Sequence, residues 1–297
     1  MSSEAQSLLN EWSPPLVLDA IILLFAVLYF RGWIALRRSS PGLLSPGQLA
    51  AFFAGMFWLW FAIGSPLAAF DDASLAVHMS QHILLMLVVP PLVLVGAPAL
   101  PLLHGLPQWF VRTIFGPFLR WPVVQSLGKV LTHPLVCWIF AAVALIGWHV
   151  PFAFELALRS DFWHEVEHAC FLSTSLLFWW PVVQPFPSEA RWPRWSIPLY
   201  LFFGMLPGGA LGAFLAFCDR VLYPSYREAP SLFHVSALSD QILAGTLMWV
   251  LGTFVCLIPA VMITMKLLSP GEVSGDPHRR STGFAPKEFS SAGTSRL

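Results

Sequence analysis

Charged residues are scarce in this 297-residue chain: they make up 11% of the sequence and sum to no net charge. Soluble domains carry about 25% charged residues, so most of this surface is not built for water. The lack of excess positive charge and of a basic stripe argues against a nucleic-acid partner. The four cysteines stand singly with no CxxC pair, which argues against a disulfide framework and against a thiolate metal cage.

Apolar residues are abundant instead: 57% of the residues are hydrophobic, and the mean hydropathy is +0.69. About 20 apolar residues in a helix cross the hydrocarbon core of a bilayer. Residues 1–268 are therefore predicted to form an all-α bundle of seven transmembrane helices, at residues 16–36, 48–69, 75–98, 134–151, 163–184, 196–218 and 239–268. Residues 99–133 mix aromatic and basic side chains and are expected to be interfacial or re-entrant. Residues 269–297 are predicted to be a disordered tail.

The basic residues set the expected orientation, because Lys and Arg concentrate in cytoplasmic loops. With seven helices, only Arg159, Arg220 and Arg227 of the 16 Lys and Arg residues fall on one side of the membrane. That side is predicted to be the outside, with the N-terminus outside and the C-terminus in the cytoplasm. Glu4 and Glu11 stand where a signal peptide needs basic residues, so the first apolar run is expected to remain as an uncleaved helix.

Histidines form the strongest functional pattern. His78 and His82 stand four residues apart at the start of the third predicted helix, which places both imidazoles on one face, one turn apart. His164 and His168 repeat this spacing at the start of the fifth helix, and His149 closes the fourth. In the predicted topology all five lie at the outer level of the membrane, where ionisable groups usually face the bundle interior. A shared metal or haem site at this level is therefore predicted.

Other side chains are candidates for roles near this site. Asp240 opens the seventh predicted helix on the same side, and is a candidate ligand, an orienting carboxylate or a helix N-cap. Glu167 is expected to accept a hydrogen bond from an imidazole and so orient it. Met79, Cys170 and Cys218 are candidate soft ligands, although buried methionine and cysteine are more often packing residues.

Several residues at membrane depth are expected to serve mainly in packing. The methionines in this class are Met56, Met86, Met205 and Met248, although Met86 also lies near the histidine pair and its thioether suits Cu(I). Trp179 is predicted to be a packing or interfacial-belt residue. Pro90 should break or kink the third helix, and Pro207 the sixth.

These motifs together resemble the caa3-type cytochrome c oxidase assembly factor CtaG family, in its seven-helix membrane form. The resemblance covers about residues 15–268 and rests on HMSQH at 78–82, PPLVLVGAP at 90–98, GWHVP at 147–151, FWHEVEHACF at 162–171, WWP at 179–181, and Asp240, Gln241, Gly245 and Trp249. It implies a protein of the bacterial inner membrane that aids maturation of haem–copper oxidases by handling copper. The implied partner is a cytochrome c oxidase subunit or another copper-handling protein. Matched residue by residue, the family's motifs fall on His78, His82, His149, His164, His168 and Asp240.

The sequence leaves the identity of the metal open. Copper is the expected ion, because imidazole and thioether ligands suit it. One alternative is an intramembrane zinc hydrolase, in which three histidines and an acid would leave one zinc position open for water. Another is a bis-histidine haem protein, which would need paired histidines at two depths. A non-enzymatic copper-binding assembly factor is the primary hypothesis.

Overall fold

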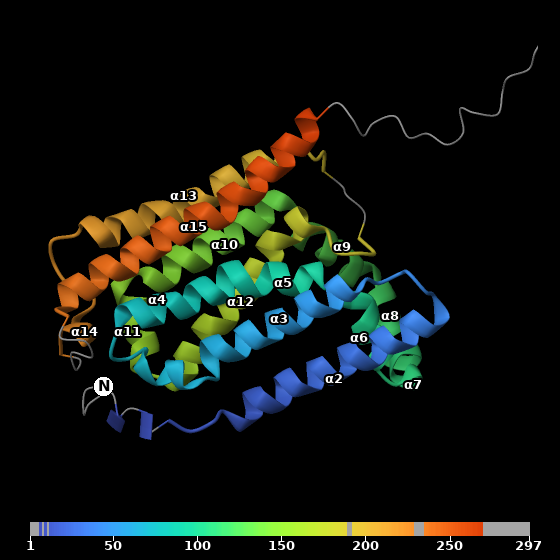
Figure 1. Ribbon diagram of the computed structural model, residues 1–297, viewed down its shortest axis with the longest axis horizontal. Helices are drawn as coiled ribbons and strands as arrows, with labels where there is room; N and C mark the ends of the chain where they lie inside the picture. The colour runs from blue at the N-terminus through green and yellow to red at the C-terminus, as the bar shows by residue number, and fades with distance from the viewer. Residues whose placement is uncertain (1–5, 8, 11, 189–191, 229–234, 270–297) are drawn as a thin grey trace, which may run out of the picture.

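The computed structural model describes residues 6–7, 9–10, 12–188, 192–228 and 235–269. These residues form helices and no strand (Figure 1), which confirms the predicted all-α class. Each of the seven predicted segments is helical: α2 (Leu16–Ser39), α3 (Pro46–Ile63), α4 (Leu75–Ile83) continued by the π-helix η2 (Leu84–Val88) and α5 (Val89–Val95), α10 (Pro134–His149), α12 (Asp161–Val183), α13 (Ser196–Phe217) and α15 (Ala237–Leu268). The predicted tail lies outside the described residues except for its first residue, Ser269.

The helices are those of a multi-pass membrane protein, but fewer than seven are long and apolar enough to cross a bilayer unaided. Within the described part of the chain there are five, or six if α9 (Pro122–Leu131) and α10 form one bent span. α10 alone has 16 residues, short of the about 20 that a span needs. α12 has 23 residues, but Glu167 and His168 lower its hydropathy. The prediction of seven spans is therefore not confirmed.

The segment predicted to be interfacial consists of short helices, namely α6 (Ala99–Gly105), α7 (Gln108–Phe110), the π-helix η3 (Val111–Phe115), α8 (Gly116–Arg120) and α9. α6 approaches α2 so closely that two glycines are required at the contact. A Cβ atom on Gly32 would overlap the carbonyl oxygen of Pro101, and one on Gly105 would overlap that of Leu28. Small residues allow membrane helices to approach in this way. The contact ties α2 to the rest of the bundle.

The helix that follows His82 contains a proline whose missing hydrogen bond is replaced by a tryptophan. Pro90 has no N–H to offer the carbonyl oxygen of Met86, four residues earlier. The indole Nε1 of Trp179 in α12 donates to that oxygen over 3.0 Å. Trp179 is 3% exposed and packs in a hydrophobic core cluster, which confirms the predicted packing role. Its second role, as a buried hydrogen-bond donor, was not predicted.

The same arrangement recurs at the proline of α13. Pro207 leaves the carbonyl oxygen of Phe203 without its helical donor, and the indole Nε1 of Trp138 in α10 donates to that oxygen over 3.1 Å. Because the bilayer core offers no water to such a group, a donor from a neighbouring helix is the available replacement. These two indoles link α10 to α13 and α12 to the histidine-bearing helix.

We predict that Trp179→Phe lowers the free energy of unfolding by about 1–3 kcal/mol, because it leaves the Met86 carbonyl oxygen buried without a donor. Thermal unfolding in detergent measures the effect. Trp109→Phe is the matched control, since the ring of Trp109 is 65% exposed, and its melting temperature should equal that of wild type. Equal shifts in the two variants would contradict the role given to the Trp179 indole.

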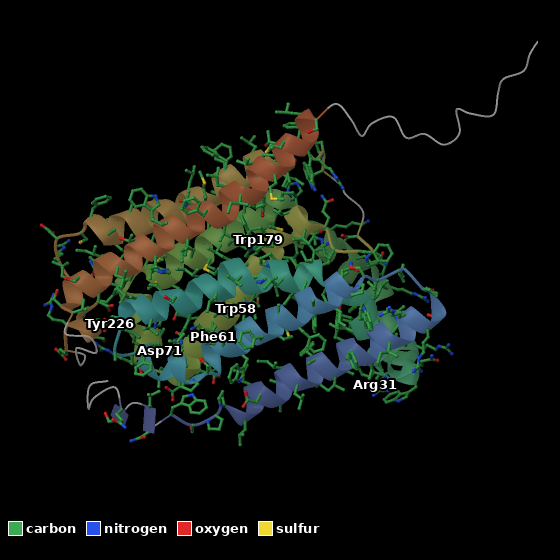
Figure 2. The ribbon with its side chains drawn as sticks, in the orientation of Figure 1. Arg31, Trp58, Phe61, Asp71, Trp179 and Tyr226 are labelled. Atoms are coloured by element: carbon green, nitrogen blue, oxygen red, sulfur yellow. The ribbon has the colours of Figure 1, made fainter. Side chains whose placement is uncertain are left out.

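Short helices close one end of the bundle around the start of α4. These are α11 (Pro151–Leu158) and α14 (Pro224–Glu228). The hydroxyl of Tyr226 donates to the carbonyl oxygen of Asp71 over 2.8 Å, and that of Tyr223 donates to the carbonyl oxygen of His149 over 3.1 Å. Figure 2 shows Asp71 and Tyr226 at this end of the molecule and Arg31 toward the other. The loops are thereby fixed over the helix ends that carry the histidines.

Candidate metal site

α4 begins at a polar junction with α15. The Ser74 side chain accepts a hydrogen bond from the N–H of Val77, as an N-cap does. Asp240 reaches the same point from α15: its Oδ1 accepts from the Ser74 hydroxyl over 2.9 Å and its Oδ2 from the N–H of Leu75 over 2.6 Å. Both carboxylate oxygens of Asp240 are thus engaged in capping α4. The structure thus places Asp240, a predicted ligand, at the start of α4. The N-cap of α15, the helix of Asp240 itself, is Ser236.

His78 and His82 both face Glu167 of α12. Nε2 of His78 lies 3.8 Å from one carboxylate oxygen of Glu167, and Nε2 of His82 lies 3.7 Å from the other. One candidate ligand atom from each residue falls within 4.8 Å of the other two. Two imidazoles and a carboxylate are a donor set that metal sites in proteins use. Glu167, expected to orient a histidine or to serve as the acid of the zinc alternative, is therefore a candidate ligand itself.

The remaining predicted histidines lie in the same group. The ring of His164 stacks on that of His78 with centroids 5.1 Å apart, and the ring of His168 lies 5.6 Å from that of His82. His149 of α10 lies 5.9 Å from His82, measured between ring centroids. Three helices thus bring five histidines and one glutamate together. We call the set the histidine–glutamate cluster: His78, His82, His149, His164, Glu167 and His168.

Most polar atoms of the cluster have no hydrogen-bond partner among the described residues. The unpaired buried atoms are Nδ1 and Nε2 of His78 and His82, both carboxylate oxygens of Glu167, and Nε2 of His164 and His168. More than 90% of buried polar groups in proteins are paired, and an unpaired one costs about 1–3 kcal/mol. The rings of Phe154 and Phe171 contact the central imidazoles and keep their surroundings apolar. A bound transition-metal ion would be coordinated by several of these atoms at once, so these residues fit such an ion.

His149 differs from the other histidines because both of its ring nitrogens have a neighbour. Nδ1 lies 2.8 Å from the carbonyl oxygen of Leu145, which can only accept, so the ring proton sits on Nδ1. In the neutral ring, Nε2 then has a free lone pair, and it lies 3.3 Å from the thioether sulfur of Met79. A thioether has no proton to donate, so two electron-pair donors face each other. Such a nitrogen and sulfur pair suits a soft ion such as Cu(I).

The two cysteines considered as soft ligands lie elsewhere. Cys170 lines a separate open groove with Phe152 and Trp163. Cys218 directly follows the last residue of α13. Among the described residues, neither has a ligand atom within 4.8 Å of two other candidate ligands. The structure gives neither cysteine a place in the cluster.

A further buried carboxyl group lies beside the helix turn that carries His82. Gln81 is buried, and its Nε2 donates to Oδ2 of Asp71 over 3.3 Å. Asp71 stands in the loop between the 3₁₀-helix η1 (Pro66–Phe70) and α4, outside the candidate spans. Burial, together with the negative charge of neighbouring Asp72, raises the pKa of Asp71 to about 7.

We predict that Asp71→Asn becomes more stable relative to wild type as the pH rises from about 4 to about 8. An unfolded aspartate titrates near pH 3.9, so in wild type the folded state must give up its proton at a higher pH than the unfolded chain, and stability falls across this window. Unfolding in detergent at several pH values measures the difference. Asp219→Asn, at an exposed position, should show none. A constant difference between Asp71→Asn and wild type would contradict the prediction.

Comparison with known proteins agrees with the motifs. A family model described as cytochrome c oxidase caa3 assembly factor matches residues 27–269. Uncharacterized proteins of Mycobacterium bovis and Mycobacterium tuberculosis are each 26% identical over 272 residues, which are 88% of this chain and 39% of theirs. One of Mycobacterium leprae is 23% identical over 87% of this chain and 39% of its own. The chain thus spans 39% of the length of these curated relatives. No solved structure matches the chain significantly.

Proposed function

Because the chain belongs to the cytochrome c oxidase caa3 assembly factor family, we propose that it binds copper in the histidine–glutamate cluster and aids its delivery to a haem–copper oxidase. The observation that carries this proposal is the set of buried imidazole and carboxylate atoms without hydrogen-bond partners. Imidazole and thioether ligands suit copper. The role proposed for the protein is binding and transfer, with copper as its cargo.

The cluster offers a graded path for the ion. His164 and His168 are half-buried, whereas His78 and His82 are buried. An ion would meet the first pair of imidazoles before the second. Because His164 stacks on His78 with centroids 5.1 Å apart, a moving ion would keep one imidazole while it gains the next. Glu167 would supply negative charge at the inner position, and His149 with Met79 would supply the softest donors.

The proposal includes seven spans, with α12 and the bent α9–α10 pair among them. The N-terminus lies outside and the C-terminus lies in the cytoplasm, so the cluster faces the outer side of the bacterial inner membrane. The distribution of Lys and Arg supports this orientation. Copper would then be received and released at the membrane surface that is exposed to the periplasm.

Two alternatives are weaker on geometric grounds. Two histidines and a glutamate are also a zinc-hydrolase donor set, but such an enzyme needs an open position for substrate, and His78, His82 and Glu167 are at most 2% exposed. A bis-histidine haem needs space for the macrocycle between two imidazoles. Ring centroids of the histidine pairs in the cluster are 4.3–6.3 Å apart, and the rings of Phe154 and Phe171 pack against these imidazoles.

Complementation tests the assembly role. In a bacterium that lacks its own family member, the wild-type chain should restore oxidase activity in isolated membranes, and a variant with His78→Leu and His82→Leu should not. His104→Ala changes an exposed histidine outside the cluster and should restore activity fully. Added copper should partly rescue the double variant, because the defect lies in metal supply. Full restoration by the double variant without added copper would overturn the proposal.

A further inference from the structure

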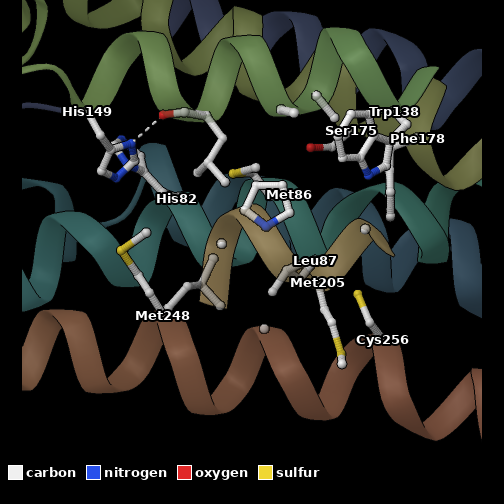
Figure 3. Close-up of a pocket in the computed structure, with 18 residues that line it drawn as sticks. His82, Met86, Leu87, Trp138, His149, Ser175, Phe178, Met205, Met248 and Cys256 are labelled. Atoms are coloured by element: carbon white, nitrogen blue, oxygen red, sulfur yellow. Dashed lines mark hydrogen bonds between the residues drawn. The ribbon is translucent and has the colours of Figure 1, made fainter. Parts of the chain in front are cut away.

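A cavity of about 90 Å³ lies inside the bundle directly beside the histidine–glutamate cluster. α10, α12, α13, α15 and the helix that carries His82 line it. Figure 3 shows His82 and His149 toward one end of the cavity and Met205 and Cys256 toward the other. The cavity therefore begins at the cluster and leads away from it.

Sulfur atoms dominate the reactive groups of the lining. Four lining residues carry sulfur: Met86, Met205, Met248 and Cys256. They come from three separate elements, η2, α13 and α15. Most of the remaining wall is apolar, and Gly204, Gly208 and Gly252 add no side chain to it. Met86 lies in the π-helix, a distortion that often marks functional positions in helices.

The pair formed by His149 and Met79 adds a second observation at this place. Its two facing electron-pair donors, 3.3 Å apart, stand where the cluster meets the cavity, because His149 also lines the cavity. Neutral imidazole and thioether groups are poor partners for hard ions such as Mg²⁺ and favour Cu(I). The donors thus become softer from Glu167 through His149 to the methionines.

We propose that the cavity is a second, soft metal site that holds Cu(I) beside the histidine–glutamate cluster; this inference rests on the copper-handling role proposed above. A charge is costly in an apolar space unless it is paired. Cys256 can supply the pairing charge. A thiol that binds a metal gives up its proton, and the resulting thiolate neutralises a monovalent ion. The copper stays Cu(I) throughout, and the proton of Cys256 is released when the ion binds.

The test uses Ag(I), a soft monovalent ion without redox chemistry, and Cu(I) under anaerobic conditions, each bound to the purified full chain. Wild type should bind about one Ag(I) more per chain than a variant with Met86→Leu, Met205→Leu and Met248→Leu. X-ray absorption of the Cu(I)-loaded protein should show sulfur neighbours in wild type that weaken in this triple variant. Met262→Leu, at a side chain 55% exposed on α15, is the matched control and should behave as wild type.

The outcomes separate the two proposals. Copper with nitrogen and oxygen neighbours alone, and equal Ag(I) binding in wild type and the triple variant, would overturn the soft site and leave the cluster's role intact. No copper binding by wild type would overturn both proposals. If the triple variant fails to fold, Cys256→Ser alone should still remove the release of a proton on Ag(I) binding, measured as a pH change in weak buffer. An unchanged proton release would contradict the site.

Discussion

Replacing His78 and His82 by leucine should abolish copper binding in the histidine–glutamate cluster and leave the bundle folded. Wild type is expected to bind about one copper ion per chain more than the double variant, because two adjacent ligands of the cluster are lost. Equilibrium dialysis against Cu(I), with metal measured by mass spectrometry, gives the stoichiometry. His104→Ala, outside the cluster, should retain full binding.

The melting temperature of this double variant without metal independently tests whether the two histidines serve the fold or a metal. In wild type both ring nitrogens of His78 and His82 are buried without partners. Leucine is similar in volume and has no polar atoms to leave unpaired, so the melting temperature of the metal-free double variant should equal or exceed that of wild type. A marked drop in melting temperature together with retained copper binding would show that these histidines serve the fold and not a metal.

The largest effect on stability is expected from Gly105→Ala. The new Cβ atom would overlap the backbone of Leu28, and a backbone cannot rotate away as a side chain can. α2 and α6 would have to separate, at a cost of about 3 kcal/mol. Thermal unfolding in detergent and the yield of folded protein from membranes both report this loss.

Gly128→Ala is the matched control for this substitution. No atom outside its own helix lies within 4 Å of a Cβ atom built there, and Gly128 lies in α9. Alanine is the better helix former by about 1 kcal/mol, so this variant should be as stable as wild type or more stable. Similar melting temperatures for the two variants would contradict the close approach of α2 and α6.

Local spacing predicted the part of the site that depends on a single helix. The i, i+4 pairs at His78 and His82 and at His164 and His168 fix which imidazoles share a face. The apolar pattern then predicted that all seven segments are helical. The number of spans was harder to predict, because the polar residues of α12 that build the site also weaken its hydropathy signal.

Contacts between residues of two helices far apart in the sequence could not be predicted from the spacing of residues within either helix. Asp240 was a candidate ligand, orienting carboxylate or N-cap, and the structure shows it capping α4 from across the helix interface. The partner of Met79 is His149, 70 residues away, and the donor to the Met86 carbonyl oxygen is Trp179, 93 residues away. The nearest sequence signal was Pro90, since a proline in a membrane helix requires a replacement donor somewhere.

The metal content of the wild-type protein, purified in mild detergent without added metal, tests the central claim most directly. Inductively coupled plasma mass spectrometry gives the identity and amount of each metal per chain. Copper at about one ion per chain or more is the predicted result. Zinc in its place, or no transition metal even after incubation with Cu(I), would contradict a copper-binding role for the histidine–glutamate cluster.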